Sequence, residues 1–274
     1  MNPAPPSAAA YRHGHPAAAP AQGGADPLQA LLFDVDGTLA ETEETHRLAF
    51  NAIFAAAGLP WHWDVPTYRR LLAVTGGRER IAAWMDEIAA PERARADCAA
   101  WIAELHARKT RRYGEMLAAG QLELRPGVRR LLEEARAAGL RLAIVTTTSH
   151  ANLPPLFAAA LPKVGAQALD WFEVVVTGEQ VKRKKPDPEA YALALDRLGL
   201  TPAACLAIED TVNGLRAAQG AGLAVLITEG LYSQGDDFSG ALRVVPHLDD
   251  DGSEAHQPVT LATLARWHAQ RDDY

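Results

Sequence analysis

Six short apolar runs, separated by stretches of helical pattern, place the strongest constraint on how this 274-residue chain can fold. The runs are rich in β-branched and aliphatic residues and have the length of strands buried on both faces: ALLFDVDG (30–37), LRLAIVTT (140–147), FEVVVTG (172–178), CLAIED (205–210), LAVLIT (223–228) and LRVVP (242–246). Amphipathic helical segments lie between them, such as PGVRRLLEEARAAG, which begins at Pro126 and ends at Gly139. Alternating strands and helices predict an α/β fold, a doubly wound parallel (Rossmann-like) sheet with right-handed crossovers.

Residues 43–121 interrupt this alternation. They contain no strand-like run but several helical ones, namely THRLAFNAIFAAAG, TYRRLL, RERIAAWMDEIA and ADCAAWIAELHARKTRRYGEML. We predict that they form a helical cap, inserted after the first strand, and that the core consists of 28–42 and 122–246. Residues 1–27 are rich in Ala, Pro and Gly and are expected to be a disordered tail. The C-terminal extension, 247–274, has no role that the sequence defines.

Composition narrows the class of protein. With 48% hydrophobic and 22% charged residues the chain resembles a globular protein, and no apolar stretch approaches the ~20 residues of a membrane span. The formal charge of −7 disfavours nucleic acid as a partner, because phosphate backbones attract basic surfaces. Two cysteines without metal-type spacing suit a reducing compartment. We expect a cytoplasmic monomer with neither a membrane nor a nucleic acid as its partner.

Acidic residues stand at the ends of two predicted strands. Asp34 and Asp36 close the first run, and alternate strand residues project to the same face. Glu209 and Asp210 close another run, and the carboxyl ends of parallel strands meet at one rim of the sheet. Carboxylates this close are costly to ionise unless a cation lies beside them, and Mg²⁺ prefers such oxygen ligands. One aspartate could simply cap the next helix, but that role does not account for two acidic pairs.

Hydroxyl and basic groups are predicted at the same rim. The second strand ends in Thr146, Thr147 and Thr148, whose hydroxyl and N–H groups can bind phosphate oxygens, although threonine is also common in strands. Lys185 precedes Pro186, which favours an extended backbone just ahead of a predicted helix. A lysine placed there could reach a phosphoryl group. For the other basic residues of this run, 182–184, we expect a solvated surface.

In this order, DVDGT (34–38), Thr146, Lys185-Pro186 and Glu209-Asp210 resemble the four motifs of the haloacid dehalogenase superfamily, over residues 28 to 230. The helical insert after the first motif resembles the C1-type cap of that family. DVDGTLAETEETHRLAFN, WHWD (61–64), TGGRERI (75–81) and KKPDPEAY further resemble the CbbY-type branch, near β-phosphoglucomutase.

The resemblance implies roles for the residues at the rim. Asp34 would be the nucleophile that forms an aspartyl-phosphate, and Asp36 would be the general acid and then the base. Thr146 and Lys185 would balance the charge of the phosphoryl oxygens. Mg²⁺ would be held by the Asp34 carboxylate, the Asp36 backbone carbonyl and Asp210, with Glu209 in the inner or outer sphere.

The resemblance also implies that the cap selects the substrate. Glu43 and His46 lie one helical turn apart and can both face the cleft, although a histidine there could equally be a surface residue. The Gly76-Gly77 loop would bring Arg78 or Arg80 to a second phosphate in a bidentate contact. The expected substrate-binding residues are Glu43, His46, Gly76, Gly77, Arg78, Arg80, Thr147 and Thr148.

The activity implied by this resemblance is that of a Mg²⁺-dependent sugar-phosphate phosphatase. Members of the branch remove phosphate from xylulose-1,5-bisphosphate, a misfire product that inhibits Rubisco in the Calvin cycle. A sugar phosphomutase of the β-phosphoglucomutase type shares the same motifs, and a phosphatase for phosphoglycolate or sugar monophosphates is a further alternative. A phosphate-binding regulator without catalysis would require the loss of a chemical residue, and none is missing. The chain has neither GxxxxGK[ST] nor a strand-linked GxGxxG, which disfavours a nucleotide-dependent kinase or dehydrogenase.

Overall fold

The computed structural model describes residues 27–119, 122–161 and 164–271. The tail predicted for 1–27 lies outside these ranges except for its last residue, and so does residue 121, the predicted end of the cap. Within the described residues, no helix has both the length and the apolar character needed to cross a membrane.

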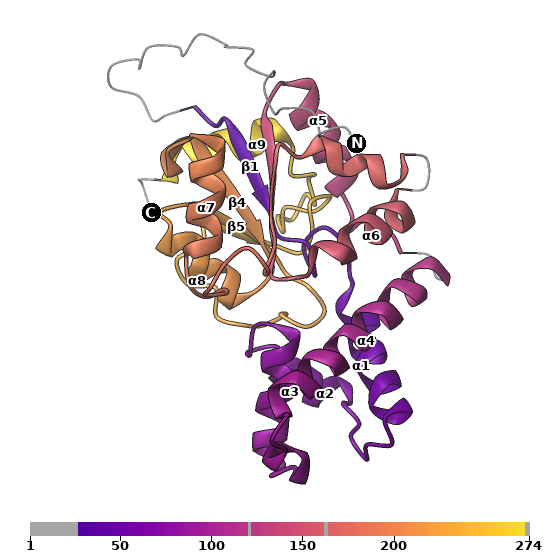
Figure 1. Cartoon of the computed structure of the whole chain (residues 1–274). Helices are drawn as coiled ribbons and strands as arrows, with labels where there is room; N and C mark the ends of the chain where they lie inside the picture. Colours follow the sequence, from indigo (N-terminus) through magenta and orange to yellow (C-terminus); the bar gives the residue numbers. More distant parts are fainter. Residues whose placement is uncertain (1–26, 120–121, 162–163, 272–274) are drawn as a thin grey trace, which may run out of the picture.

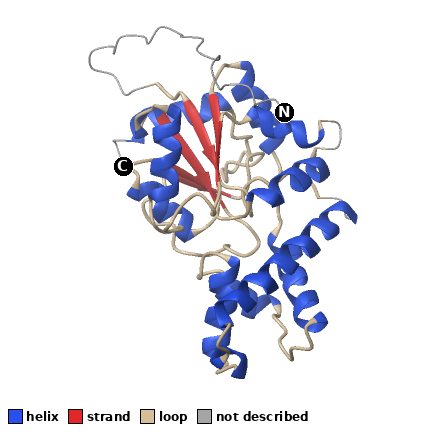
Figure 2. Ribbon diagram, viewed as in Figure 1, coloured by secondary structure: helices blue, strands red, loops and turns tan. Residues whose placement is uncertain are grey.

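A parallel sheet of six strands forms the centre of the molecule (Figure 2). The strands lie in the order β3-β2-β1-β4-β5-β6, and each lies within one of the six predicted runs. Their bounds are β1 Ala30–Phe33, β2 Arg141–Val145, β3 Val174–Val176, β4 Cys205–Glu209, β5 Ala224–Thr228 and β6 Arg243–Val245. Phe33 is in register with both Ile144 and Ile208, so β1, β2 and β4 end at the same level. The residues that follow these strands therefore share one rim.

Helices cover both faces of the sheet (Figure 1). Leu31 and Phe33 of β1 pack in one apolar cluster with α5 (Val128–Ala137), α6 (Leu153–Ala160) and α9 (Leu261–Ala269). Ala30 and Leu32 point to the opposite face, which α7 (Glu189–Leu198) and α8 (Val212–Gly220) cover. Because successive residues of a strand face opposite sides, the continuous apolar runs are buried on both. The predicted doubly wound fold is confirmed.

The C-terminal stretch, whose role the sequence left open, packs on the sheet domain. Leu248, Val259, Leu264 and Trp267 belong to the same apolar cluster as α5 and α6. Up to residue 271 this stretch therefore completes one covered face of the sheet.

Helices α1–α4 form a separate body beyond the carboxyl ends of the strands (Figure 1), which we call the helical module. Their bounds are α1 Glu43–Ala56, α2 Val65–Leu71, α3 Gly77–Glu87 and α4 Cys98–Ala119. The module has its own aromatic core, in which the ring of Trp63 lies 4.7 Å from that of Phe50. Asp64 of the same WHWD stretch caps α2 by accepting a hydrogen bond from Thr67 N at 2.8 Å. Four short 3-10 helices complete the described elements: η1 Pro91–Ala94, η2 His150–Asn152, η3 Gly165–Trp171 and η4 Pro202–Ala204.

Candidate active site

Three buried carboxylates meet at the rim of the sheet. Asp34 follows β1, Glu209 is the last residue of β4, and Asp210 comes next; each offers an oxygen within 4.8 Å of the others. The ammonium of Lys185 donates to Asp34 Oδ1 at 2.6 Å, to Glu209 Oε1 at 2.5 Å and to the Val145 carbonyl at 2.7 Å. Lys185 thus pairs with two of these three buried acidic groups, and negative charge is in excess at the site.

Burial and the excess of negative charge change the pKa values of these groups. Burial raises the pKa of Asp34 to about 8, although the charge of Lys185 opposes the shift. Burial also raises the pKa of Asp210 well above its usual range. Against the effect of burial, Asp34 and Glu209 raise the pKa of Lys185. A divalent cation beside the carboxylates would favour their ionised forms, so the three oxygen donors fit a hard cation such as Mg²⁺.

Asp36 has a different set of partners. Both aspartates lie beyond the last residue of β1, so strand alternation does not orient them, and the Asp36 carboxylate is not part of the acidic cluster. Asp36 Oδ1 accepts a hydrogen bond from the Thr42 hydroxyl and lies 3.0 Å from His46 Nε2. The opposite ring nitrogen of His46 contacts the ammonium of Lys109, which has donors only. His46 therefore accepts at Nδ1 and donates from Nε2 to Asp36.

This chain from Lys109 through His46 to Asp36 sets their charges. Burial opposes ionisation of Asp36, but His46, Thr42 and Lys109 together lower its pKa to about 2. Burial lowers the pKa of Lys109 to about 7, and burial together with the Lys109 charge lowers the pKa of His46. In this arrangement Asp36 is a carboxylate and His46 is neutral.

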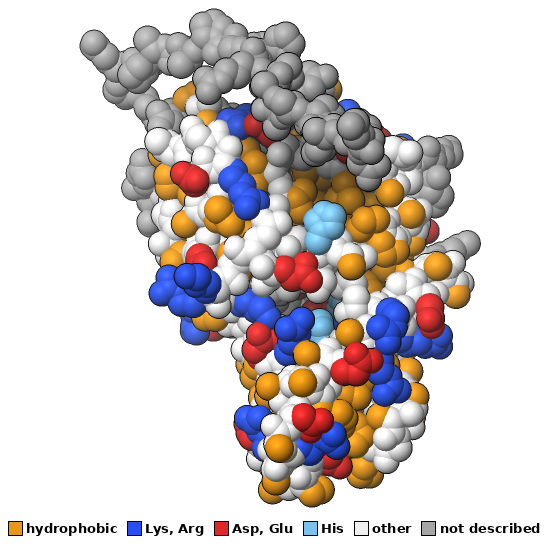
Figure 3. All heavy atoms as spheres, in the orientation of Figure 1, with side chains coloured by type: hydrophobic (Ala, Val, Ile, Leu, Met, Phe, Trp, Pro, Cys, Tyr) orange, Lys and Arg blue, Asp and Glu red, His pale blue; other side chains and the backbone are white. Residues whose placement is uncertain are grey.

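A polar cavity of about 440 Å³ lies between the helical module and the sheet domain. Figure 3 shows basic and acidic side chains gathered around a histidine at this junction. Asp36 lines the cavity, and so do all the residues expected to bind substrate: Glu43, His46, Gly76, Gly77, Arg78, Arg80, Thr147 and Thr148. Residues from distant parts of the sequence are thus brought to one cavity, although their individual roles stay predictions.

Arg78 and Arg80 both line the cavity, but they differ in their contacts. Arg80 is buried and donates to the Tyr68 hydroxyl at 3.0 Å and to the Leu71 carbonyl at 3.2 Å. Tyr68 in turn donates to Glu43 Oε2 at 2.6 Å, so Arg80 and Tyr68 fix Glu43 in place. Arg78 also lines the cavity, and within the described part of the chain it makes no hydrogen bond or ion pair. Arg78 is therefore the better placed of the two to bind an anion.

The surroundings of Lys184 differ from those expected from the sequence. We expected a solvated surface residue, but its ammonium lies 2.6 Å from Glu79 Oε1 and lines the cavity. Glu79 belongs to α3, so this ion pair joins the helical module to the loop that carries Lys185. Gly76 has a φ of +97°, which other residues rarely adopt, and a Cβ there would lie 2.2 Å from Glu79 Oε2 and 2.6 Å from Lys184 Nζ.

The threonines after β2 form a tight turn at the cavity. The Thr146 hydroxyl accepts from Thr148 N at 3.1 Å, and Asn152 Nδ2 donates to the Thr148 hydroxyl at 2.8 Å. A Cβ on Gly178 would lie 2.3 Å from the Thr147 carbonyl, so the two loops approach closely there. The hydroxyl of Thr146 is thus engaged within the turn.

Sequence reasoning missed several residues of the cavity. His106 and Lys109 come from α4, three residues apart and so on one side of the helix, and burial lowers the pKa of His106 to about 3. The signal was the short sequence HARK, but nothing local indicates which side of α4 faces the sheet.

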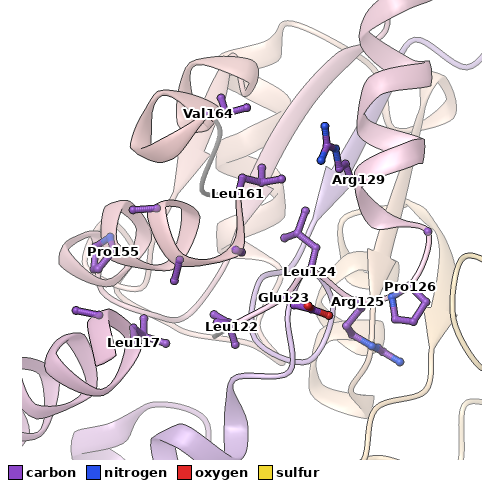
Figure 4. A pocket seen from close by; sticks show the side chains of 15 residues that line it. Leu117, Leu122, Glu123, Leu124, Arg125, Pro126, Arg129, Pro155, Leu161 and Val164 are labelled. Carbon is purple, nitrogen blue, oxygen red and sulfur yellow. The ribbon is translucent and has the colours of Figure 1, made fainter. Parts of the chain in front are cut away.

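A larger cavity, of about 950 Å³, lies elsewhere (Figure 4). It is lined mainly by apolar residues of α4, of α6 and of the connection between α4 and α5, among them Leu117, Leu124 and Pro155. The charged residues in its lining are Glu123, Arg125 and Arg129, and the acidic cluster lies elsewhere, so the smaller polar cavity is the candidate active site.

Comparison with known proteins agrees with this geometry. The model of the family described as haloacid dehalogenase-like hydrolase matches residues 28–222. The chain belongs to the haloacid dehalogenase-like hydrolases. It is 51% identical over 229 residues to protein CbbY of Rhodobacter capsulatus, covering 83% of this chain and 97% of that protein. It is 48% identical over 250 residues to the plasmid-encoded CbbY of Cupriavidus necator, covering 88% and 97%.

A solved relative has the same fold. The crystal structure of CbbY from Rhodobacter sphaeroides with phosphate is 43% identical and has a TM-score of 0.74, covering 84% of this chain and 98% of that one. A substituted form of that CbbY, with the same identity and TM-score, was solved in complex with xylulose-1,5-bisphosphate. The predictions of the family, of its CbbY-type branch and of a phosphatase are confirmed.

Proposed function

We propose that this chain is a Mg²⁺-dependent phosphatase for xylulose-1,5-bisphosphate that acts through an aspartyl-phosphate on Asp34. One observation carries the proposal: basic groups lie both at the rim of the sheet and in the polar cavity next to it. Lys185 lies at the rim beside Asp34, whereas Arg78 and Lys109 line the cavity from the helical module. A sugar with a phosphate at each end matches this distribution of charge, and the CbbY complex with that sugar supports the choice. We expect the enzyme to act as a cytoplasmic monomer.

In the first step, an oxygen of Asp34 attacks phosphorus and the bond from phosphorus to the sugar oxygen breaks. Asp36 gives its proton to the leaving oxygen, which becomes a hydroxyl. Asp36 is ionised in the free protein, so it must take up this proton as the phosphate dianion arrives, because a neighbouring negative charge raises the pKa of a carboxyl. Lys185 and the Thr146 turn lie where they can offset the charge on the phosphoryl oxygens.

In the second step, water attacks phosphorus and the bond to Asp34 breaks, which releases phosphate. Asp36, again a carboxylate, accepts the proton of the water, and the His46 N–H orients its Oδ1. Asp34, Glu209, Asp210 and the Asp36 carbonyl are the groups that would hold Mg²⁺. When bound, the ion would supply positive charge next to the transferred phosphoryl group.

The test is phosphate release from a panel of sugar mono- and bisphosphates and phosphoglycolate, with and without Mg²⁺. We expect release chiefly from xylulose-1,5-bisphosphate and only with Mg²⁺. Preferred release from phosphoglycolate or a monophosphate would refute the substrate. Conversion of β-glucose-1-phosphate to glucose-6-phosphate, without net release, would indicate the phosphomutase instead.

A variant and its matched control test where the second phosphate of the substrate binds. Arg78→Ala should raise the KM for xylulose-1,5-bisphosphate more than that for a monophosphate, because only the bisphosphate has a second phosphate to bind. Arg111→Ala, which alters an exposed arginine on α4, serves as the control. Equal effects of Arg78→Ala on both substrates would contradict the assigned position of the second phosphate.

A further inference from the structure

Arg125 lies in the chain between the helical module and α5, and its guanidinium has oxygen partners from several distant segments. The residue is buried, and its guanidinium contacts four backbone carbonyls, the Thr228 hydroxyl and one carboxylate. Nη1 donates to Gly37 O and, at 2.9 Å, to Thr228 O; Nη2 donates to Glu229 O at 2.5 Å and to Pro246 O at 3.0 Å. Nε lies 3.2 Å from Glu41 Oε1. A guanidinium has five N–H donors; both Nη atoms are hydrogen-bonded here, and Nε is ion-paired with Glu41.

These contacts join segments that are distant in the sequence. Thr228 is the last residue of β5, Glu229 follows it and Pro246 follows β6, so one side of the guanidinium is fixed to the sheet. The other side holds Gly37 and Glu41, which lie in the stretch between Asp36 and α1. The turn that carries Asp36 is thereby tied to the rim of the sheet.

The same residue joins the two connections between the sheet domain and the helical module. The chain enters the module through residues 37–42 and returns through 122–127. Arg125 N donates to Leu39 O at 2.8 Å, and Leu124 forms a bridge with Ala40. With the ion pair to Glu41, the side chain and backbone of Arg125 hold both connections against each other.

The turn fixed in this way also contacts the acidic cluster. Thr38 donates from its hydroxyl to Asp210 Oδ1 at 3.2 Å. A Cβ on Gly37 would lie 2.0 Å from Asp210 Oδ2, so the turn and Asp210 are in close contact. A shift of Gly37 therefore displaces Asp36 on one side and the contact with Asp210 on the other.

We propose that Arg125 is a positioning residue for the reaction: it fixes the turn of residues 36–41 and holds the two connections to the helical module together at the rim. It touches neither substrate nor reacting atoms. Its effect on turnover rests on the proposed phosphatase function, whereas its effect on the turn does not.

The test compares Arg125→Lys with Arg130→Lys. Arg130 is a matched control, because it also donates to backbone carbonyls, to Leu248 O at 2.6 Å and Val259 O at 3.3 Å, but has no contact with residues 36–41. Lysine keeps the charge but has no planar fork with which to reach all of these acceptors. Removing the support of a reacting group typically costs about 10–100-fold, so we expect kcat to fall by that factor in Arg125→Lys, with KM within about threefold of wild type.

The second readout is amide hydrogen exchange of the peptide covering residues 35–41, measured without metal or substrate. We expect faster exchange there in Arg125→Lys and wild-type exchange in Arg130→Lys. Equal kcat and equal exchange in the two variants would overturn the proposal. If wild type releases no phosphate from any sugar phosphate, the proposed function fails, and the exchange comparison alone decides the role of Arg125.

If Arg125→Lys fails to fold, the same two measurements on Glu41→Gln test the proposal. This substitution removes one partially exposed charge and leaves the four carbonyl contacts in place. We expect faster exchange over 35–41 and a lower kcat than wild type. Wild-type behaviour in both measurements would then overturn the proposal.

Discussion

The backbone of α8 comes so close to Glu209 that only glycine fits at position 214. A Cβ built there would lie 1.9 Å from Glu209 Oε2, about 1.5 Å closer than an ordinary contact between heavy atoms. Glu209 cannot move aside freely, since its Oε1 accepts hydrogen bonds from Lys185 at 2.5 Å and from the Tyr191 hydroxyl at 2.6 Å. Gly214→Ala therefore forces either α8 or Glu209 out of position.

The expected loss of stability combines three contributions to the free energy of unfolding. Overpacking a buried site costs about 1–3 kcal/mol. A weakened hydrogen bond to a charged group costs about 1.5–3 kcal/mol. Alanine returns about 1 kcal/mol as a better helix former. We expect Gly214→Ala to lower the free energy of unfolding by about 1.5–5 kcal/mol, which lowers Tm by at least about 3 °C in a chain of this size.

Gly114→Ala is the matched control, because it makes the same change inside α4. A Cβ there would meet no atom within 4 Å. The variant should gain about 0.5–1 kcal/mol from helix propensity and keep its activity.

Thermal unfolding followed by circular dichroism and phosphate release from xylulose-1,5-bisphosphate measure the two variants. Gly214→Ala should also lose about tenfold or more in kcat, because Glu209 holds Lys185 beside Asp34. A Gly214→Ala protein with the Tm and the kcat of wild type would refute the reasoning, since it would mean that Glu209 is not rigidly held.

Asp34→Asn removes the proposed nucleophile and should reduce turnover below about one thousandth of wild type without lowering Tm; near-normal phosphate release would contradict the role. The pKa of Lys109 is lowered from 10.5 to about 7, so the unfolded chain binds more protons than the folded one between these pH values, and the folded state gains stability as pH rises through them. Lys109→Met removes this penalty and should raise the free energy of unfolding at pH 7 by up to about 4 kcal/mol, with a smaller gain near pH 10; identical pH dependence of urea unfolding in the variant and wild type would argue against it. Glu79→Gln breaks the exposed ion pair with Lys184 and should change stability by less than about 1 kcal/mol while raising KM several-fold at unchanged kcat. Glu87→Gln, which breaks an exposed ion pair inside the helical module, should leave KM unchanged in the same steady-state assay.

The strands could be predicted because burial on both faces produces a recognisable pattern in the local sequence. A run such as LAVLIT is apolar at every position, and a short apolar run between turn residues has few other structures open to it. The rim residues followed from the strands, since parallel strands end at one edge. Asp34, Lys185, Glu209 and Asp210 thus met as expected.

The other contacts of the site could not be predicted, because they depend on how the helical module packs against the sheet domain. Lys184 looked like one of four consecutive cations, and only the approach of α3 turns it into a partner of Glu79. The local sequence does not indicate what Lys109 and Arg125 contact, because their surroundings come from residues far away in the sequence. The segment after β2 was also not recognised as α6, although Pro154 and Pro155 stand in the first helical turn, where a missing N–H costs little.

The close pairing of residues 39–40 with 124–125 has a consequence for protein engineering. Because the chain leaves and re-enters the sheet domain at neighbouring points, residues 41–123 form an insertion whose two ends are already joined. Such an insertion can be exchanged for that of a relative without rebuilding the sheet, provided that the acceptors of Arg125 are kept. We expect exchange of the helical module to alter which sugar is chosen, and the proposed chemistry at Asp34 to persist where the new module again supplies partners for Asp36 such as Thr42 and His46.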